Sequence, residues 1–260
     1  MMHTAWEDIS HGTTIGPFSF DLSVQANERY WHSAGVSHNV FVVGAAYPLI
    51  AANATVLTWL DKCATPMIQT RQHLECHGIA YCPVQLTTHG RVTDRFDRRG
   101  RTYISVATEI SGAGQTLWTS TVDFTPTSAV IQETTREGRA RSTPTHIDGY
   151  RKALQITADR IRQYSRRGNY HSDASTAEEL GLPGLVAQGT QVCGPAFDLL
   201  ADAWGERFIR TGVIDLQFVG MVTADEIVEA TVKVDGDNAA LQVWNQTKNR
   251  LAAVGTASLL

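Results

Sequence analysis

The chain has 260 residues, of which 43% are hydrophobic and 18% charged, a composition typical of a globular protein rather than a disordered one. Its 22 basic and 26 acidic residues give a net charge of −4, so no overall basic field favours nucleic acid as a partner. The four cysteines are too few for a disulfide framework. Free thiols are typical of a reducing compartment, and we therefore expect a cytoplasmic protein.

The first half of the chain opens with a short amphipathic segment at 22–27 and continues into a stretch without charged residues, 39–60. This stretch is long enough to span a bilayer, but its glycine, proline, asparagine and threonine residues would be costly in lipid. We therefore predict a buried helix and no membrane partner. Apolar and polar residues then alternate with the period of a strand at 67–76, 84–94, 102–110 and 116–124.

Residues 126–149 are rich in threonine, arginine, proline and glycine, which predicts a linker or crossover between two halves, 1–125 and 150–260. Three arginines form a basic cluster in this segment: Arg136, Arg139 and Arg141. The cluster either contacts a phosphate-bearing ligand or belongs to a solvated connection.

The second half repeats the order of the first. Residues 154–159 correspond to 22–27, and an uncharged stretch at 180–197 predicts a second buried helix. Each half therefore predicts one central helix followed by an antiparallel meander. The strand-like segments of the second half lie at 207–218, 226–234, 239–246 and 250–258. Sequences typical of tight turns lie at 97–100, 111–114 and 235–238.

A helix wrapped by an antiparallel sheet, present twice in one chain, resembles the double hotdog fold, an α+β architecture. The second half also resembles the signature of the MaoC-like (R)-specific enoyl-CoA hydratases and dehydratases. The matching positions are His171, Asp173, Ala177 and Gly181, followed by Ala187-Gln188-Gly189. Residues 218–220 and 245–251 resemble two further landmarks of that family, whereas the first half matches it only in architecture.

The sequence departs from this signature at two positions. The family places an aspartate five residues before the histidine, where this chain has Arg166. If the loop is shortened instead, Asn169 stands in place of the aspartate. The histidine of the family's Ala-His-Gly is replaced by Gln188. On either alignment, the ionisable carboxylate is missing.

The resemblance implies that His171 transfers protons, because imidazole titrates near neutrality. It implies that Asn169 orients a water or a carbonyl, and that Tyr170 either supplies a phenolic proton or packs. A helix expected to begin at Gln188 and Gly189 would offer backbone N–H groups to the thioester oxygen. No metal site and no cofactor are expected.

Only the second half is expected to carry the site, because His32 and His38 lack the surrounding landmarks. The first half is expected to line an acyl pocket with residues such as Phe41, Tyr47 and Trp59. Asp173 is expected to cap the helix that follows it. A homodimer of two double hotdogs is a compatible assembly.

The leading hypothesis is a hydratase- or dehydratase-type lyase that acts on a 3-hydroxyacyl or enoyl thioester of CoA or of a carrier protein. One alternative is a related hotdog enzyme, namely a thioesterase, an isomerase or a cyclase. The other is a non-catalytic subunit that binds acyl thioesters. The expected partner in each case is an acyl thioester.

Overall fold

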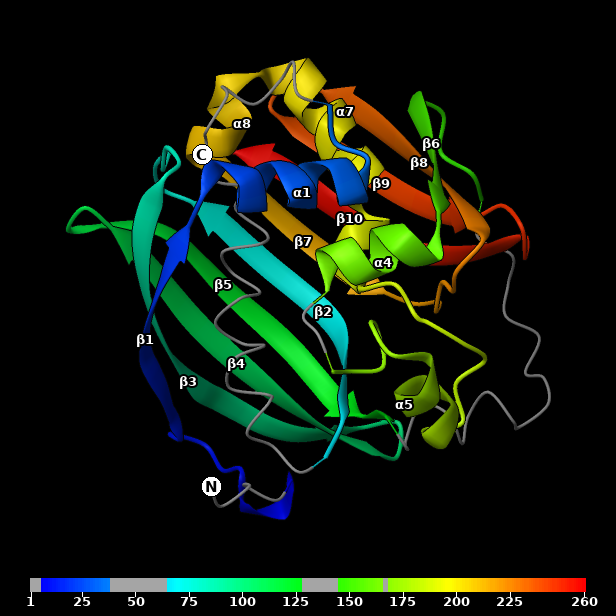
Figure 1. Cartoon of the computed structure of the whole chain (residues 1–260). Helices are drawn as coiled ribbons and strands as arrows, with labels where there is room; N and C mark the ends of the chain where they lie inside the picture. Colours follow the sequence, from blue (N-terminus) through cyan, green and yellow to red (C-terminus); the bar gives the residue numbers. More distant parts are fainter. Residues whose placement is uncertain (1–5, 38–64, 128–144, 166–167) are drawn as a thin grey trace.

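Ten strands form one continuous antiparallel sheet that runs through both halves of the chain (Figure 1). The computed structural model describes residues 6–37, 65–127, 145–165 and 168–260. In their order across the sheet, the N-terminal five strands are β1 (Thr14–Leu22), β3 (Val84–Arg98), β4 (Arg101–Gly112), β5 (Gln115–Pro126) and β2 (Met67–Cys76). The C-terminal five continue with β7 (Gly212–Phe218), β10 (Arg250–Leu259), β9 (Asn238–Asn245), β8 (Glu226–Asp235) and β6 (Tyr150–Ile156).

The two halves have the same topology. Counted from its own first strand, each half has the order first, third, fourth, fifth, second, and the halves meet where β2 pairs with β7. The expected turns are present between β3 and β4, between β4 and β5 and between β8 and β9. This internal symmetry agrees with the duplicated unit that the repeat predicts.

Two strands and one helix differ from the sequence-based expectation. β1 and β6, the outer strands of the sheet in the described residues, fall outside the predicted segments, because their alternation between buried and exposed residues is confined to the last few positions of each. The strand predicted at 207–218 begins only at Gly212. Before it lies helix α8 (Glu206–Thr211), which buries Phe208 and Ile209 and pairs Glu206 with Arg210 one helical turn later.

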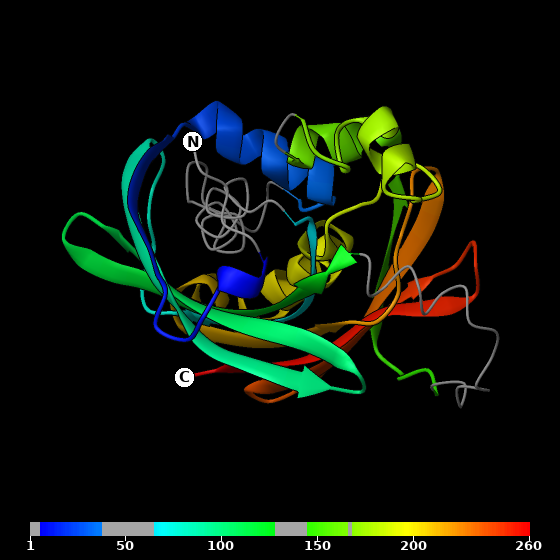
Figure 2. The same cartoon turned by 90° about the horizontal axis from the view of Figure 1, so that it is seen from below.

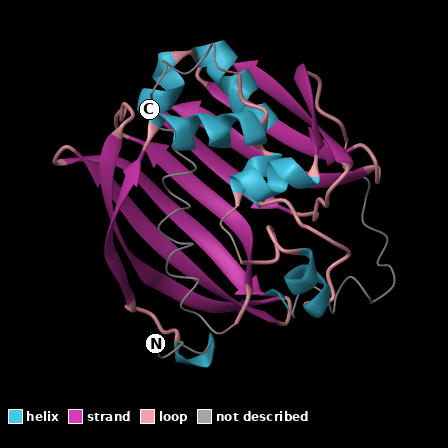
Figure 3. Ribbon diagram, viewed as in Figure 1, coloured by secondary structure: helices cyan, strands magenta, loops and turns pink. Residues whose placement is uncertain are grey.

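The helices gather on one face of the sheet (Figure 3). The sheet curves around its interior, and three of the helices lie across the open side (Figure 2). These three are α1 (Val24–Ala34), α4 (Ala158–Tyr164) and α5 (Ala174–Glu179). The other helices among the described residues are the 3-10 turn η1 (Trp6–Asp8), α6 (Gly189–Val192), α7 (Gly194–Trp204) and α8.

Helix α7 is the central helix of the C-terminal half. It packs on β6, β8 and β9, and its side chains at Phe197, Leu200 and Ala201 are buried. Within the uncharged stretch 180–197, helix begins only at Gly189. The preceding residues 185–187 hydrogen-bond instead to the segment 222–224. The helix predicted at 39–60 lies outside the described residues, as does the arginine cluster of the linker.

A buried charge joins α7 to both halves of the chain. Asp198 is 1% exposed and accepts hydrogen bonds from the backbone N–H of Ser37, at 2.6 Å, and from its hydroxyl, at 3.0 Å. Lys152 of β6 forms an ion pair with the same carboxylate. A buried carboxylate is costly unless it is paired and hydrogen-bonded, and these contacts supply that compensation.

The C-terminal end of the predicted linker is bound to the outer face of the sheet. Gln242 donates to the carbonyl of Thr145 and accepts from the N–H of Ile147, at 3.0 and 3.1 Å. The ring of His146 stacks on Trp244, with the ring centroids 4.0 Å apart. Within the part of the chain that the structure describes, no helix is long and apolar enough to cross a membrane.

The start of α7 packs so closely on α1 that only glycine fits there. A Cβ at Gly194 would lie 2.0 Å from the carbonyl oxygen of Ala34, which is backbone and cannot move aside alone. We expect Gly194→Ala to lower the free energy of unfolding by about 1–3 kcal/mol, measured by urea denaturation. Gly78→Ala is the matched control, because its Cβ would meet only the end of the Leu117 side chain at 3.3 Å. Equal stability of the two variants would contradict this packing.

Candidate functional site

The loop that precedes α5 is held by Asn169. Its side-chain oxygen accepts from the backbone N–H of His171 at 3.0 Å, and its carbonyl accepts from the N–H groups of Ser172 and Asp173, both at 2.9 Å. Asp173 accepts from the N–H of Ser175 and caps α5, as expected. The side-chain oxygen of Asn169 thus shapes the backbone of the loop, in the manner of an Asx turn.

The imidazole of His171 is fixed by a backbone carbonyl. Its Nδ1 lies 2.5 Å from the carbonyl oxygen of Val186, and a carbonyl oxygen can only accept. Nδ1 therefore carries the proton in the neutral ring, and Nε2 carries the lone pair. Tyr170 packs against the imidazole, with the ring centroids 4.0 Å apart. The half-buried His171 is thus held in one tautomer that suits a general base.

The hydroxyl of Tyr170 is engaged elsewhere. It donates to the carbonyl oxygen of Met67, the first residue of β2, at 3.0 Å. Burial raises the pKa of this phenol well above its ordinary value. Of the two roles considered for Tyr170, this geometry favours packing, and the contact ties the loop of the second half to the first half.

Gln188 and Gly189 lie where helix α6 begins. Gln188 is the residue before its first turn, and the amide of this buried side chain donates to the hydroxyl of Ser165 at 3.2 Å. The first N–H groups of a helix have no partner within the helix itself, and at α6 the first of them is that of Gly189. A Cβ at Gly189 would lie 2.5 Å from the ring of Phe218, so packing alone accounts for glycine here.

The hydrogen bond from His171 connects the loop before α5 with the start of α6, because its acceptor, Val186, is close in sequence to Gly189. The N–H of Ala187 donates to the carbonyl of Val222 at 2.9 Å, and the N–H of Ala224 donates to that of Leu185 at 3.0 Å. Residues 185–187, which include the acceptor of His171, are therefore extended and hydrogen-bonded to residues 222–224. No residue pattern predicts this arrangement, since its acceptors are backbone carbonyls.

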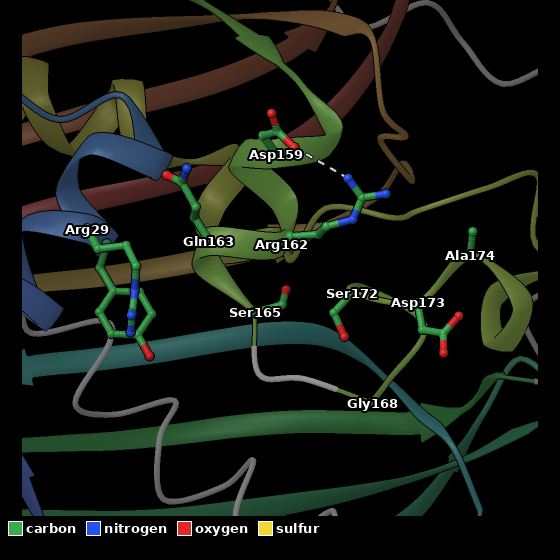
Figure 4. Close-up of a pocket in the computed structure, with 10 residues that line it drawn as sticks. Arg29, Asp159, Arg162, Gln163, Ser165, Gly168, Ser172, Asp173 and Ala174 are labelled. Atoms are coloured by element: carbon green, nitrogen blue, oxygen red, sulfur yellow. Dashed lines mark hydrogen bonds and ion pairs between the residues drawn. The ribbon is translucent and has the colours of Figure 1, made fainter.

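A pocket with a volume of about 890 Å³ lies beside this site, between α1, α4 and the loop that carries His171 (Figure 4). Ser165 and Ser172 line it, and these hydroxyls contact Gln188 and Asn169 respectively. Two guanidinium groups also line it. Arg162 forms an exposed ion pair with Asp159 at 3.4 Å, and Arg29 lies over the ring of Tyr30.

The other residues expected to contribute lie elsewhere or cannot be placed. His32 is exposed on α1, and its backbone carbonyl accepts from Arg160 of α4. His38 and Arg166 lie outside the described residues, as do Phe41, Tyr47 and Trp59, which were expected to line the acyl pocket.

Comparisons with known proteins bear on the family. Residues 142–256 match the family model described as a MaoC like domain. No curated protein matches the chain in sequence. The chain is similar in structure to a MaoC-like dehydratase from Phytophthora capsici, with 13% identity, a TM-score of 0.73 and 96% of each chain covered.

Two further solved structures are similar. The match to full-length peroxisomal multifunctional enzyme type 2 from Drosophila melanogaster has 14% identity and a TM-score of 0.76, and it covers 95% of this chain and 48% of that one. A Mycobacterium tuberculosis protein described as having a double hotdog fold matches with 10% identity and a TM-score of 0.66, over 99% of this chain and 97% of that one. The chain thus has the double hotdog fold, and its residues 142–256, less than half of its length, match the MaoC like domain.

Proposed function

We propose that the protein is a hydratase- or dehydratase-type lyase acting on a 3-hydroxyacyl or enoyl thioester. The observation that carries this proposal is the hydrogen bond from Nδ1 of His171 to the carbonyl of Val186. It fixes the tautomer in which Nε2 is the base, and its acceptor, Val186, is close in sequence to the helix start at Gly189. A base and a set of oxyanion donors are the two groups that addition or loss of water requires.

In the hydration direction, Nε2 of His171 takes a proton from water as the water oxygen bonds to C3 of the enoyl thioester. The electron pair of the double bond moves to the thioester oxygen, where the N–H groups at the start of α6 stabilise it. The imidazolium then returns its proton to C2. Because Asn169 cannot accept a proton, the same imidazole serves both steps. Dehydration follows the reverse sequence.

Double-bond isomerisation is the runner-up. The side-chain oxygen of Asn169 accepts from the N–H of His171 and holds the loop, so its acceptor is not dedicated to a water. One base and one oxyanion site suffice to move a proton between two carbons of an acyl thioester. The same arrangement would also serve a subunit that binds acyl thioesters without catalysis.

We further propose that the pocket beside the loop receives the phosphate-bearing arm of the substrate, from CoA or from a carrier protein. Arg29 and Arg162 supply cationic groups there, and the exposed pair of Arg162 with Asp159 costs little to break.

The free thiols of Cys76, Cys82 and Cys193 support a cytoplasmic location.

The first test is a panel of 3-hydroxyacyl, enoyl and saturated acyl-CoA thioesters, with products identified by mass spectrometry. The products separate the candidate functions. Gain or loss of water indicates a hydratase or dehydratase, double-bond migration an isomerase, free acid a thioesterase, and no change a binding subunit. In His171→Ala we expect turnover to fall by about a hundredfold or more, because a general base contributes on that order. His32→Ala is the control, since that side chain is exposed on α1. Equal turnover in wild type and His171→Ala would exclude His171 as the base.

A second prediction concerns the missing carboxylate. An aspartate at position 169 can accept from the N–H of His171 as the asparagine does, so the loop should keep its shape. If the reaction is hydration, Asn169→Asp should raise the rate by about tenfold or more, because it adds a second proton acceptor. Asp202→Asn, which changes charge at an exposed position of α7, should leave the rate unchanged. A lower rate in Asn169→Asp would contradict a role for position 169 in handling water and would favour its facing the substrate carbonyl, because a carboxylate repels a developing oxyanion.

A third prediction concerns the pocket. Arg162→Ala should raise KM for a CoA thioester by about tenfold, because one charge-assisted hydrogen bond to the phosphate is lost. The value of kcat should change little. The same variant should not affect KM for the N-acetylcysteamine thioester of the same acyl group, which has no phosphate. Arg210→Ala removes an arginine with a similar exposed ion pair from α8 and is the matched control. Equal KM changes for both substrates would contradict phosphate binding in this pocket.

A further inference from the structure

A buried carboxylate contacts the segment 222–224, which hydrogen-bonds to residues 185–187 and so to the acceptor of His171. Glu226, at the start of β8, is 4% exposed, and each of its two oxygens receives two donors. Oε1 accepts from the hydroxyl of Thr223 at 2.7 Å and from Nζ of Lys248 at 2.5 Å. Oε2 accepts from the N–H of Thr223 at 2.9 Å and from the amide of Asn245 at 2.5 Å.

These donors keep Glu226 charged. Burial by itself raises the pKa of a carboxyl, but the hydrogen bonds from Lys248, Thr223 and Asn245 outweigh it and lower the pKa of Glu226 below its ordinary value. The donors are themselves held in place, because the side-chain oxygen of Asn245 accepts from the backbone N–H of Lys248 at 3.0 Å. The buried group is therefore an anion with a fixed set of partners at neutral pH.

The residue that Glu226 holds most directly is part of the site. Thr223, which donates twice to the carboxylate, pairs as an isolated β-bridge with Val186. The residues on each side of Thr223 hydrogen-bond to Leu185 and Ala187. The carbonyl of Val186, between those two residues, is the acceptor for Nδ1 of His171. An unbroken series of contacts thus runs from Lys248 and Glu226 to the imidazole.

We propose that Glu226 is a positioning residue that, together with Lys248 and Asn245, fixes the tautomer of His171 and the place where α6 begins. The inference rests on the proposed function of His171 as a base. Buried ion pairs are weak contributors to stability, because desolvation offsets their attraction. What this carboxylate supplies is a defined geometry for the turn at Thr223, and through it for the Val186 carbonyl.

Glu226→Gln is the first test, because the amide keeps the shape but turns one acceptor oxygen into a donor that faces other donors. Two readouts apply, nitrogen-15 NMR of the His171 imidazole, assigned by its loss in His171→Ala, and steady-state kinetics. We expect the Nε2–H tautomer of His171 to gain population. We expect kcat to fall by on the order of tenfold to a hundredfold with KM little changed, because misplacement of a catalytic group acts on the chemical step.

Two further variants separate positioning from stability. Lys248→Met should shift the tautomer in the same direction, and Lys248→Arg should restore it, since arginine supplies the same charge. If Glu226→Gln does not fold, this pair decides the question. Glu229→Gln is the matched control on β8, because that carboxylate contacts Arg151 and Gln246 at the surface.

An unchanged His171 tautomer in folded Glu226→Gln, or in both Lys248 variants, would overturn the inference whatever the enzyme assays give. A shifted tautomer in a protein whose wild type acts on no thioester would uphold the positioning role and reject the proposed function. The two proposals therefore fail in distinguishable ways.

Discussion

The structure depends on the pairing of β2 with β7, which joins two five-stranded units into one sheet. Residues 71–75 pair with 213–217, and Arg71 forms an ion pair with Asp215 across the join. Without this ladder, β2 and β7 would each be an edge strand and would present a row of unpaired backbone groups to solvent. With it, β1 and β6 are the outer strands of the sheet that the described residues form, and the apolar sides of both units face a shared interior.

That shared interior contains charge, and the way the charge is compensated explains the arrangement of the helices. Asp198 and Glu226 are both buried, and each is bound by a lysine and by hydrogen bonds from a serine or a threonine. One set of contacts fixes α7 against β6 and the end of α1. The other fixes the turn before β8. Each polar cluster therefore selects one packing among the several that apolar contacts alone would permit.

Much of the fold follows from the period of the sequence. Eight strand-like segments were predicted, and all eight contain strands, because a half-buried antiparallel strand alternates clearly. The strands β1 and β6 carry that signal only over their last few residues. The prediction for α8 is wrong because its short apolar pattern fits either structure. The family resemblance pointed to the loop at His171 and to the helix start at Gly189. It could not reveal the carbonyls of Val186 and Met67, because any residue type offers a backbone carbonyl.

The contact between Tyr170 and Met67 gives the duplication a chemical consequence. The loop with the imidazole belongs to the second half, and one of its anchors belongs to the first half. In two separate polypeptides this contact would form only on association and would depend on their concentrations. Within one chain it forms intramolecularly, at an effective concentration set by the connection between the halves. A double hotdog chain can thus keep the loop at His171 anchored to the first half at any dilution.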